Sequence, residues 1–410
     1  MYIDFKTYNL NIGGYKMNLP RIPKEEFEVR RKKLQEKMKE EGYDLLFIYA
    51  NDGAVFGQEH TRYLFNYTPH FEDACILMPA EGEALLVTGY ESEEYVKTSS
   101  FCRNVQVVEE FNYGAHDFPF ANVVSLKEAI QNVQTLYNKP VEKMGVIGKE
   151  KMTIDFYYLL LDAIDNKNLD EVDQMILDLR LYKTDNEIKV IEYAYYIAEK
   201  GMEAAINAIK VGKTEREIAA EAEYVMRNLG SEGMGIDTMV ASGSVNSAPI
   251  IARTTFKQIE QNELVVLTIA PRYEGYHAAI ARPVILGEVN PAVEEAIKAA
   301  IRAQEIAQEL LVPGNNGNEV DSASRKVVAE KGLEKHFVYT GGHSIGVSEF
   351  EPPSLNASFK QPIAENMVFS VDIPIFFNDW GGFRYENGFH ITADGARPLQ
   401  KLDKDVIRIQ

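Results

Sequence analysis

Cysteine is scarce in this 410-residue sequence, which contains only Cys75 and Cys102 and no pair of cysteines with two residues between them. Such a chain has neither a disulfide framework nor a zinc ribbon, and its thiols fit a reducing compartment. Long apolar runs are also missing, since none approaches the roughly 20 residues that span a bilayer. No basic segment followed by an apolar one opens the chain. We therefore expect a cytoplasmic protein.

Positive charge is in short supply as well. Lysine and arginine number 43 against 62 aspartate and glutamate residues, which gives a formal net charge of -19 at pH 7. Nucleic acid and anionic membranes are bound through basic patches, and none is visible, so neither is expected as a partner. The rest of the composition, 45% hydrophobic and 26% charged, is that of an ordinary soluble globular protein.

The length suffices for two domains, each with a sizeable core. Residues 1–18 show no clear period and are expected to form a leader or an arm. Residues 19–180 alternate amphipathic helices with buried strands, beginning with a helix over Lys24–Glu41 and a strand over residues 44–50. This alternation predicts an α/β N-terminal domain with a mostly parallel or mixed sheet.

Residues 181–410 follow a different pattern. Capping boxes that start at Thr184 and Thr214 open two long helices. The later elements are expected as a strand-turn-strand stretch, two helices and two acidic strands, at residues 264–286, 291–311, 318–331, 367–376 and 382–392. This order predicts an α+β domain in which helices cover an antiparallel sheet.

The segment at residues 339–353, YTGGHSIGVSEFEPP, is the best candidate for a site. Gly341 and Gly342 allow the backbone to come close to whatever His343 faces. Taken alone, a histidine beside glycines is more often a hydrogen-bonded structural residue than a catalytic one. The motifs elsewhere in the C-terminal half favour a catalytic role.

Those motifs carry a resemblance to a known family. They read RLYKTDNEI, EGYHAAIAR, GGHSIGVSEFEPP, ENMVFSVDIP and GFRYENGFHIT. With the order of elements, they resemble the creatinase, prolidase and aminopeptidase P superfamily over nearly the whole chain. The resemblance implies a creatinase-like N-terminal domain at residues 19–180 and a pita-bread domain at residues 181–410. It also implies a homodimer with a shared cleft and a small-molecule substrate.

Metallopeptidases of this superfamily hold two divalent ions between five ligands, in the order Asp, Asp, His, Glu, Glu. The matching positions in this sequence are Thr268, Ala279, His343, Asp372 and Glu386. Two carboxylates are therefore missing and a third is shortened. Because hard oxygen donors are needed to bind such ions, the resemblance implies no normal two-metal centre, and no cofactor is expected.

The proton-handling histidines of the family mechanism are missing too. Ile250 and Phe350 occupy the positions where the superfamily usually has them. Creatinase works without metal and also replaces both aspartates, the second by an alanine, as at Ala279. The resemblance therefore favours a creatinase-like, metal-independent hydrolase of a carbon-nitrogen bond in a small polar substrate.

Particular residues are expected to carry this chemistry. His343 or His277 would act as general acid or base, while Asp372 and Glu386 orient it or hold a cationic group. The alternative for the two carboxylates is a solvated or salt-bridged pair on sheet strands, with Arg384 or Arg282 as the partner. The expected substrate contacts are His70, Glu72, Phe350, Glu351, Arg282, Thr268 and Trp380. For the tryptophan, packing on the sheet beside a turn is the more common outcome.

Three other interpretations stay open. A single divalent metal held by His343, Asp372 and Glu386 is the first. The second is an Xaa-Pro dipeptidase-like or aminopeptidase-like metallohydrolase with a degenerate metal site. The third is a catalytically inactive member of the superfamily that binds a small ligand through the old cleft.

Overall fold

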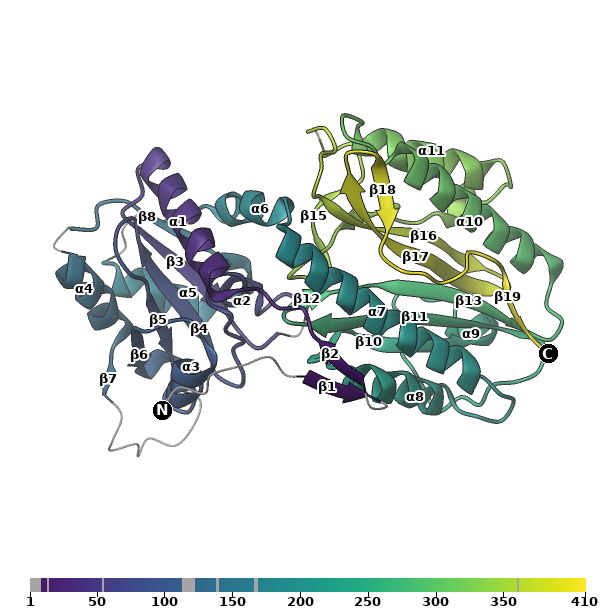
Figure 1. Ribbon diagram of the computed structural model, residues 1–410, viewed down its shortest axis with the longest axis horizontal. Coiled ribbons are helices and arrows are strands. Elements are labelled where there is room, and N and C mark those ends of the chain that lie inside the picture. The colour runs from purple at the N-terminus through teal and green to yellow at the C-terminus, as the bar shows by residue number, and fades with distance from the viewer. Residues whose placement is uncertain are drawn as a thin grey trace. The chain divides into compact units, whose positions relative to one another are not determined.

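The structure, a computed structural model, describes residues 9–12, 15–53, 55–112, 122–137, 140–165, 169–359 and 361–410. The chain divides into two compact units, which contain Lys16–Arg180 and Leu181–Gln410 (Figure 1). Within the expected leader or arm, β1 (Asn9–Ile12) and β2 (Tyr15–Asn18) pair as a small sheet. The remainder of that segment, residues 1–8 and 13–14, lies outside the described residues.

A mixed sheet forms the centre of the N-terminal domain, with the strand order β7-β6-β5-β4-β3-β8-β9. β4 is antiparallel to both β3 and β5, and the other neighbours are parallel. The expected α/β domain is thus confirmed. The strands are β3 (Leu45–Ala50), β4 (Ala74–Pro79), β5 (Leu85–Thr88), β6 (Val105–Val108), β7 (Val123–Val124), β8 (Met144–Ile147) and β9 (Leu169–Glu171).

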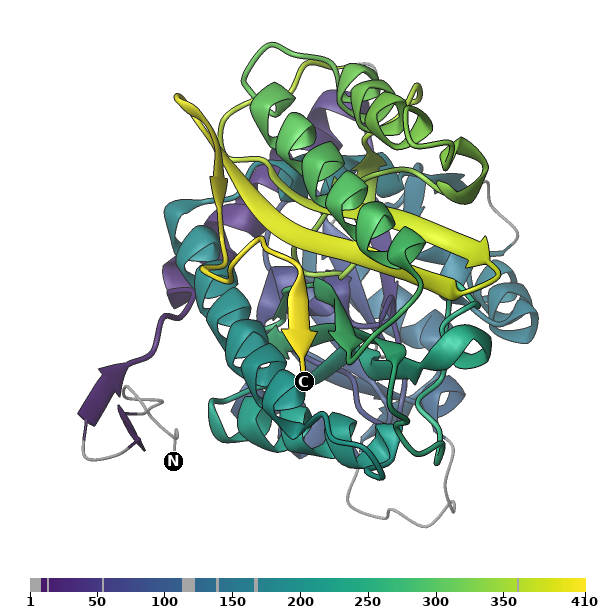
Figure 2. The same cartoon turned by 90° about the vertical axis from the view of Figure 1, so that its right-hand side faces the viewer.

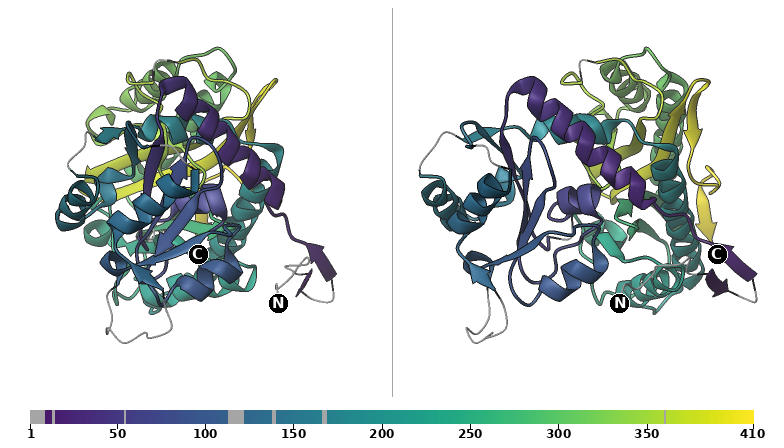
Figure 3. Two further views of the ribbon diagram at one scale, coloured as in Figure 1. Left: turned by 90° about the vertical axis from the view of Figure 1, so that its left-hand side faces the viewer. Right: turned by 60° about the vertical axis from the view of Figure 1, so that its left-hand side comes forward.

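Helices cover both faces of this sheet. Phe47 and Tyr49 of β3 pack with Leu126 and Phe156 of α4 and α5, while α1 and α2 lie on the other face (Figure 3). The helices are α1 (Lys24–Glu41), α2 (Glu59–Phe65), α3 (Glu93–Ser99), α4 (Leu126–Tyr137), α5 (Ile154–Ala163) and α6 (Asp173–Leu181), with short 3-10 turns η1 (Glu109–Phe111) and η2 (Lys149–Lys151).

The C-terminal domain is built on a larger, almost entirely antiparallel sheet, ordered β10-β11-β13-β17-β16-β14-β15. Off this path, β12 and β18 pair antiparallel with β11 and β17, and β19 pairs parallel with β13. The strands are β10 (Gly233–Ser242), β11 (Glu263–Tyr273), β12 (Tyr276–His277), β13 (Ile280–Leu286), β14 (His343–Ser344), β15 (Glu351–Ser354), β16 (Val368–Asn378), β17 (Gly381–Thr392), β18 (Gly395–Pro398) and β19 (Ile407–Ile409).

Helices pack against this sheet, as the pattern of residues 181–410 predicts. The capping boxes at Thr184 and Thr214 are both formed at the starts of α7 and α8. Figure 2 shows α10 lying across β16 and β17. The helices are α7 (Asp185–Ala208), α8 (Glu215–Asn228), α9 (Gly243–Asn246), α10 (Pro291–Leu310) and α11 (Gly317–Ala329), with the 3-10 turn η3 (Glu334–His336). Among the described residues, no helix combines the length and apolarity that crossing a membrane requires.

Strand register separates a polar side of this sheet from its core side. Ala281 of β13 lies opposite both Thr268 and Glu386, and Glu386 lies opposite Asp372. Side chains alternate along a strand, so the neighbours Ile373 and Tyr385 point the other way, into the core beneath α10. The polar side of β16 and β17 is therefore where the site can form.

Candidate metal and catalytic centre

His343 lies on the short strand β14, between β16 and β15. A Cβ atom at Gly342 would lie 2.9 Å from the backbone oxygen of Ser370, so this glycine lets β14 approach β16. The Nδ1 atom of His343 lies 2.9 Å from the carbonyl oxygen of Ser344. A carbonyl oxygen only accepts, so Nδ1 carries the proton and Nε2 of the neutral ring presents a lone pair. Burial lowers the pKa of His343 and favours this neutral form.

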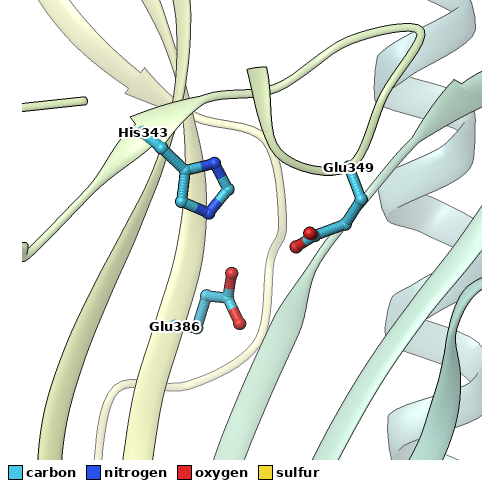
Figure 4. A group of neighbouring side chains, drawn as sticks. All are labelled: His343, Glu349 and Glu386. Atoms are coloured by element: carbon cyan, nitrogen blue, oxygen red, sulfur yellow. The ribbon is translucent and has the colours of Figure 1, made fainter. Parts of the chain in front are cut away.

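Two carboxylates approach this imidazole. Glu349 comes from the loop between β14 and β15, and Glu386 comes from β17 (Figure 4). One potential ligand atom from each of the three residues lies within 4.8 Å of the others, and all three residues are buried. One imidazole and two carboxylates suit Mn²⁺, Fe²⁺ or Zn²⁺. We call His343, Glu349 and Glu386 the triad.

Asp372 lies beside the triad and is held by other groups. Its Oδ2 atom accepts a 2.6 Å hydrogen bond from the Tyr339 hydroxyl and lies 3.8 Å from Arg384. Its Oδ1 atom is buried and has no hydrogen bond from the described residues. The interpretation with a single metal has Asp372 among the ligands, whereas the group of donor atoms within 4.8 Å contains Glu349 in its place. A ligand role for Asp372 stays a prediction.

The three buried carboxylates repel one another. Burial raises the pKa of Glu349 to about 7, with Arg384 opposing and Asp372 adding to the rise. Burial also raises the pKa of Asp372, against Arg384, and that of Glu386, to which the charges of Asp372 and Glu349 add. If all three ionise, one guanidinium faces three carboxylates, an excess of two negative charges. A divalent cation would neutralise that excess.

The loop that carries Glu349 is fastened from several sides. The buried carboxylate of Glu351 accepts a 3.0 Å hydrogen bond from the Ser348 amide and forms a 3.4 Å ion pair with Lys183. The backbone amide of His277 donates to the Gly346 carbonyl at 2.8 Å, and the His277 Nδ1 atom lies 3.2 Å from the same oxygen. Glu351 and His277 therefore hold the loop and lie outside the triad, and the substrate contact of Glu351 and the catalytic role of His277 stay predictions.

Two other predicted contacts lie close to the site. The Phe350 ring packs on His343 with 4.4 Å between ring centroids, and 41% of the phenylalanine is exposed. Thr268 is buried in the row that contains Ala281 and Glu386. Both residues therefore stay predicted substrate contacts.

Arg282 and Trp380 turn away from the site, so neither makes the predicted substrate contact there. Arg282 donates to Asn387 Oδ1 at 2.7 Å and lies over the Tyr385 ring, on the core side of the sheet. Strand alternation explains this, because Arg282 follows Ala281 of the polar row. Trp380 lies in the turn between β16 and β17 and stacks on Phe383, against the apolar core. Both side chains stabilise the sheet.

Glu72 has a different role from the predicted substrate contact. Its buried carboxylate accepts hydrogen bonds from the backbone amides of Glu91 at 3.3 Å and Ser92 at 2.9 Å, just before α3. Both oxygens are thus occupied by the amides at this helix start, where a negative charge is favourable. His70 is exposed on the N-terminal domain, and its contact with substrate stays a prediction.

Sequence reasoning missed Glu349. Within the segment SEFEPP, the resemblance assigns roles to Phe350 and Glu351 and none to Glu349. Its signal was available, because an acidic residue six positions after His343 lies within reach of the same loop. Ser370, whose hydroxyl donates to Glu386 at 2.7 Å, gave no such signal.

Two family models match this chain. Metallopeptidase family M24 matches residues 189–393, and the creatinase/prolidase N-terminal domain matches residues 30–182. The expected superfamily and pita-bread fold are thereby confirmed.

Curated relatives and solved structures agree with this assignment. The Xaa-Pro dipeptidase of Pyrococcus horikoshii is 30% identical over 80% of this chain and 89% of its own length. The Xaa-Pro dipeptidase of Pyrococcus furiosus is 34% identical over 70% of this chain and 80% of its own length. The crystal structure of the Pyrococcus horikoshii prolidase superposes with a TM-score of 0.79 at 28% identity, covering 92% of this chain and all of that chain.

The expectation that no cofactor is needed is wrong. The chain matches a metallopeptidase family, and the triad adds Glu349, which is outside the five matching positions, to His343 and Glu386. The relatives favour the metallohydrolase interpretation over the creatinase-like, metal-independent one. This chain belongs to metallopeptidase family M24, with a creatinase/prolidase N-terminal domain, and it is a hydrolase of that family.

Proposed function

We propose that this enzyme hydrolyses the peptide bond of small Xaa-Pro dipeptides with the help of one divalent metal ion held by His343, Glu349 and Glu386. The observation that carries the proposal is the convergence of these three buried donors within 4.8 Å. The dipeptide class follows from the similarity to the two Pyrococcus Xaa-Pro dipeptidases.

The donor set explains why one ion is proposed. Thr268 and Ala279 stand where the resemblance expects two aspartates, and neither side chain offers a carboxylate. Three donors leave open positions on a divalent ion, which is the arrangement of catalytic sites. When bound, such an ion polarises a carbonyl group and lowers the pKa of water.

The protein's own residues prepare this site in three ways. The bond to the Ser344 carbonyl fixes the His343 tautomer, so that Nε2 offers its lone pair. The Ser370 hydroxyl donates to Glu386 at 2.7 Å and orients that carboxylate. Phe350 packs on the imidazole and limits its contact with water.

Hydrolysis assays test this proposal. The purified protein is stripped with EDTA, reloaded with Mn²⁺, Co²⁺ or Zn²⁺, and supplied with Ala-Pro, Met-Pro and the matched dipeptide Ala-Ala. We expect cleavage of the proline dipeptides by the reloaded protein, little cleavage of Ala-Ala, and no activity in His343→Ala. Undiminished cleavage by the stripped protein would contradict the metal's role, and equal cleavage of Ala-Ala would contradict the substrate class.

We also propose that the enzyme works as a homodimer, as the resemblance implies. His70 and Phe71 support this, because both are exposed on the N-terminal domain, Phe71 by 56%. Light scattering coupled to gel filtration measures the mass directly. A monomeric mass at concentrations that retain full activity would rule the dimer out.

A further inference from the structure

Tyr195 of α7 reaches the polar side of β17. A Cβ atom built at Gly388 would lie 2.0 Å from the Tyr195 Cζ atom and 2.2 Å from its hydroxyl oxygen, so the phenol fills the place of a side chain there. Residues 386 and 388 are two apart on one strand, so their side chains point the same way. The Tyr195 hydroxyl therefore lies on the side of the sheet that carries Glu386.

The Tyr195 hydroxyl is surrounded by residues of the candidate metal and catalytic centre. Gly388 lies opposite Ser370 on β16, and the Ser370 hydroxyl donates to Glu386 at 2.7 Å. The Ala279 backbone and the Ser370 side chain are the nearest polar groups, and the charges of Glu386 and Glu349 act on the hydroxyl.

The Tyr195 side chain is fully buried, and buried hydroxyl groups normally have a hydrogen-bond partner. Its hydroxyl oxygen has no hydrogen bond of normal geometry with any described residue. Burying a hydroxyl without a hydrogen bond costs free energy. A buried hydroxyl of this kind beside a catalytic site is available to donate a hydrogen bond to a group that binds there.

We propose that Tyr195 is a further catalytic residue, whose hydroxyl donates a hydrogen bond to the substrate's peptide carbonyl oxygen when that oxygen lies beside the triad. Negative charge develops on this oxygen during hydrolysis, and a fixed donor stabilises the transition state more than the bound substrate. The proton stays on the phenol throughout. This inference rests on the proposed peptide hydrolysis.

The test compares Tyr195→Phe with the parent enzyme. Phenylalanine keeps the ring over Gly388 and removes only the donor. Loss of one such donor lowers kcat by roughly 10²-fold with little change in KM. Metal content should stay the same. A phosphinic analogue of Ala-Pro, which presents a negatively charged oxygen at the scissile position, should bind less tightly by a similar factor in calorimetry.

Tyr385→Phe is the matched control. Tyr385 is also buried with a hydroxyl that lacks a hydrogen bond among the described residues, yet its strand position turns it to the core side, below α10. Its loss should leave kcat and the affinity for the analogue unchanged.

Three outcomes would overturn the proposed role of Tyr195. A parent enzyme that cleaves no Xaa-Pro dipeptide overturns the proposed function and this inference together. An active parent with an equally active Tyr195→Phe variant overturns the inference alone. A variant that loses thermal stability while kcat and analogue affinity hold shows a structural tyrosine and also overturns it.

Discussion

The carboxylates of Glu349 and Glu386 lie within 4.8 Å of each other, although one comes from a loop and the other from the middle of β17. Both are buried, and the charge of Glu349 adds to the cost of ionising Glu386. A fold keeps such a pair when a cation or a shared proton compensates it. This relationship links the strand register to the proposed chemistry.

Glu349→Gln should weaken metal binding more than Asp372→Asn does. The glutamine removes a charged donor of the triad, whereas Asp372 interacts with Tyr339 and Arg384. Loss of an outer partner costs about 10–100-fold in metal affinity, and loss of a ligand should exceed this. Competition of Mn²⁺ with a fluorescent chelator measures both affinities.

The control for this comparison is Glu330→Gln, at an exposed position after α11, which should bind like the parent. The opposite ranking, with Asp372→Asn the weaker binder, would return Asp372 to the ligand set and remove Glu349 from it.

Stabilisation by Mn²⁺ should grow between pH 5.5 and pH 8. Burial raises the pKa of Glu349 from 4.5 to about 7, so the metal-free fold binds protons more tightly than the unfolded chain. The stability that this proton provides is present below about pH 4.5 and is lost as the pH rises through 7. A metal ion competes with that proton for the Glu349 carboxylate. At high pH, where the proton is lost, the bound metal stabilises the fold in its place.

Thermal unfolding with EDTA or with Mn²⁺ at the two pH values measures this effect. The rise in Tm on adding metal should be larger at pH 8. In Glu349→Gln, which cannot titrate there, the difference between the two pH values should shrink. A rise in Tm that is the same at both pH values in the parent would contradict the prediction.

Lys183→Met should destabilise the C-terminal domain. It removes the cation that lies 3.4 Å from the buried Glu351 carboxylate and a 3.2 Å hydrogen bond to Ser344. Breaking one side of a buried ion pair costs about 3–5 kcal/mol. Urea unfolding measures this loss in the free energy of unfolding, and the double variant Lys183→Met/Glu351→Gln should recover part of it. A single variant as stable as the parent would contradict the assigned role.

Glu72→Gln should change stability and leave KM unaltered. The glutamine weakens the charge-assisted bonds to the amides of Glu91 and Ser92, at a cost of about 0.5–2 kcal/mol. A raised KM at unchanged Tm would instead restore Glu72 as a substrate contact. His70→Ala, at an exposed position two residues earlier, tests the other predicted substrate contact of this segment in the same assay.

The fold could be predicted from the sequence because its signals are local. Capping boxes at Thr184 and Thr214 and the alternating apolar residues of β16 set helix starts and strand faces without distant contacts. His343 and Glu386 could be found from the family motifs that contain them, which lie on β14 and β17 of the same sheet.

The rest of the site depends on contacts between distant segments. Whether Arg282 faces the core or the site depends on its place in the register with Leu267, one residue beyond the Thr268–Ala281 pair. Glu349 reaches the triad because of the path of its loop, which Glu351 and Lys183 hold in place. Tyr195 reaches the site from a helix more than 100 residues earlier in the chain, which no local pattern reports.

The most direct test of the account is the metal content of the purified, dialysed protein, measured by inductively coupled plasma mass spectrometry at each point of a Mn²⁺ titration that also follows Ala-Pro cleavage. The account predicts that activity rises with bound metal and reaches its maximum at one ion per chain. Full activity without bound metal, or activity that begins only as a second ion binds, would contradict it.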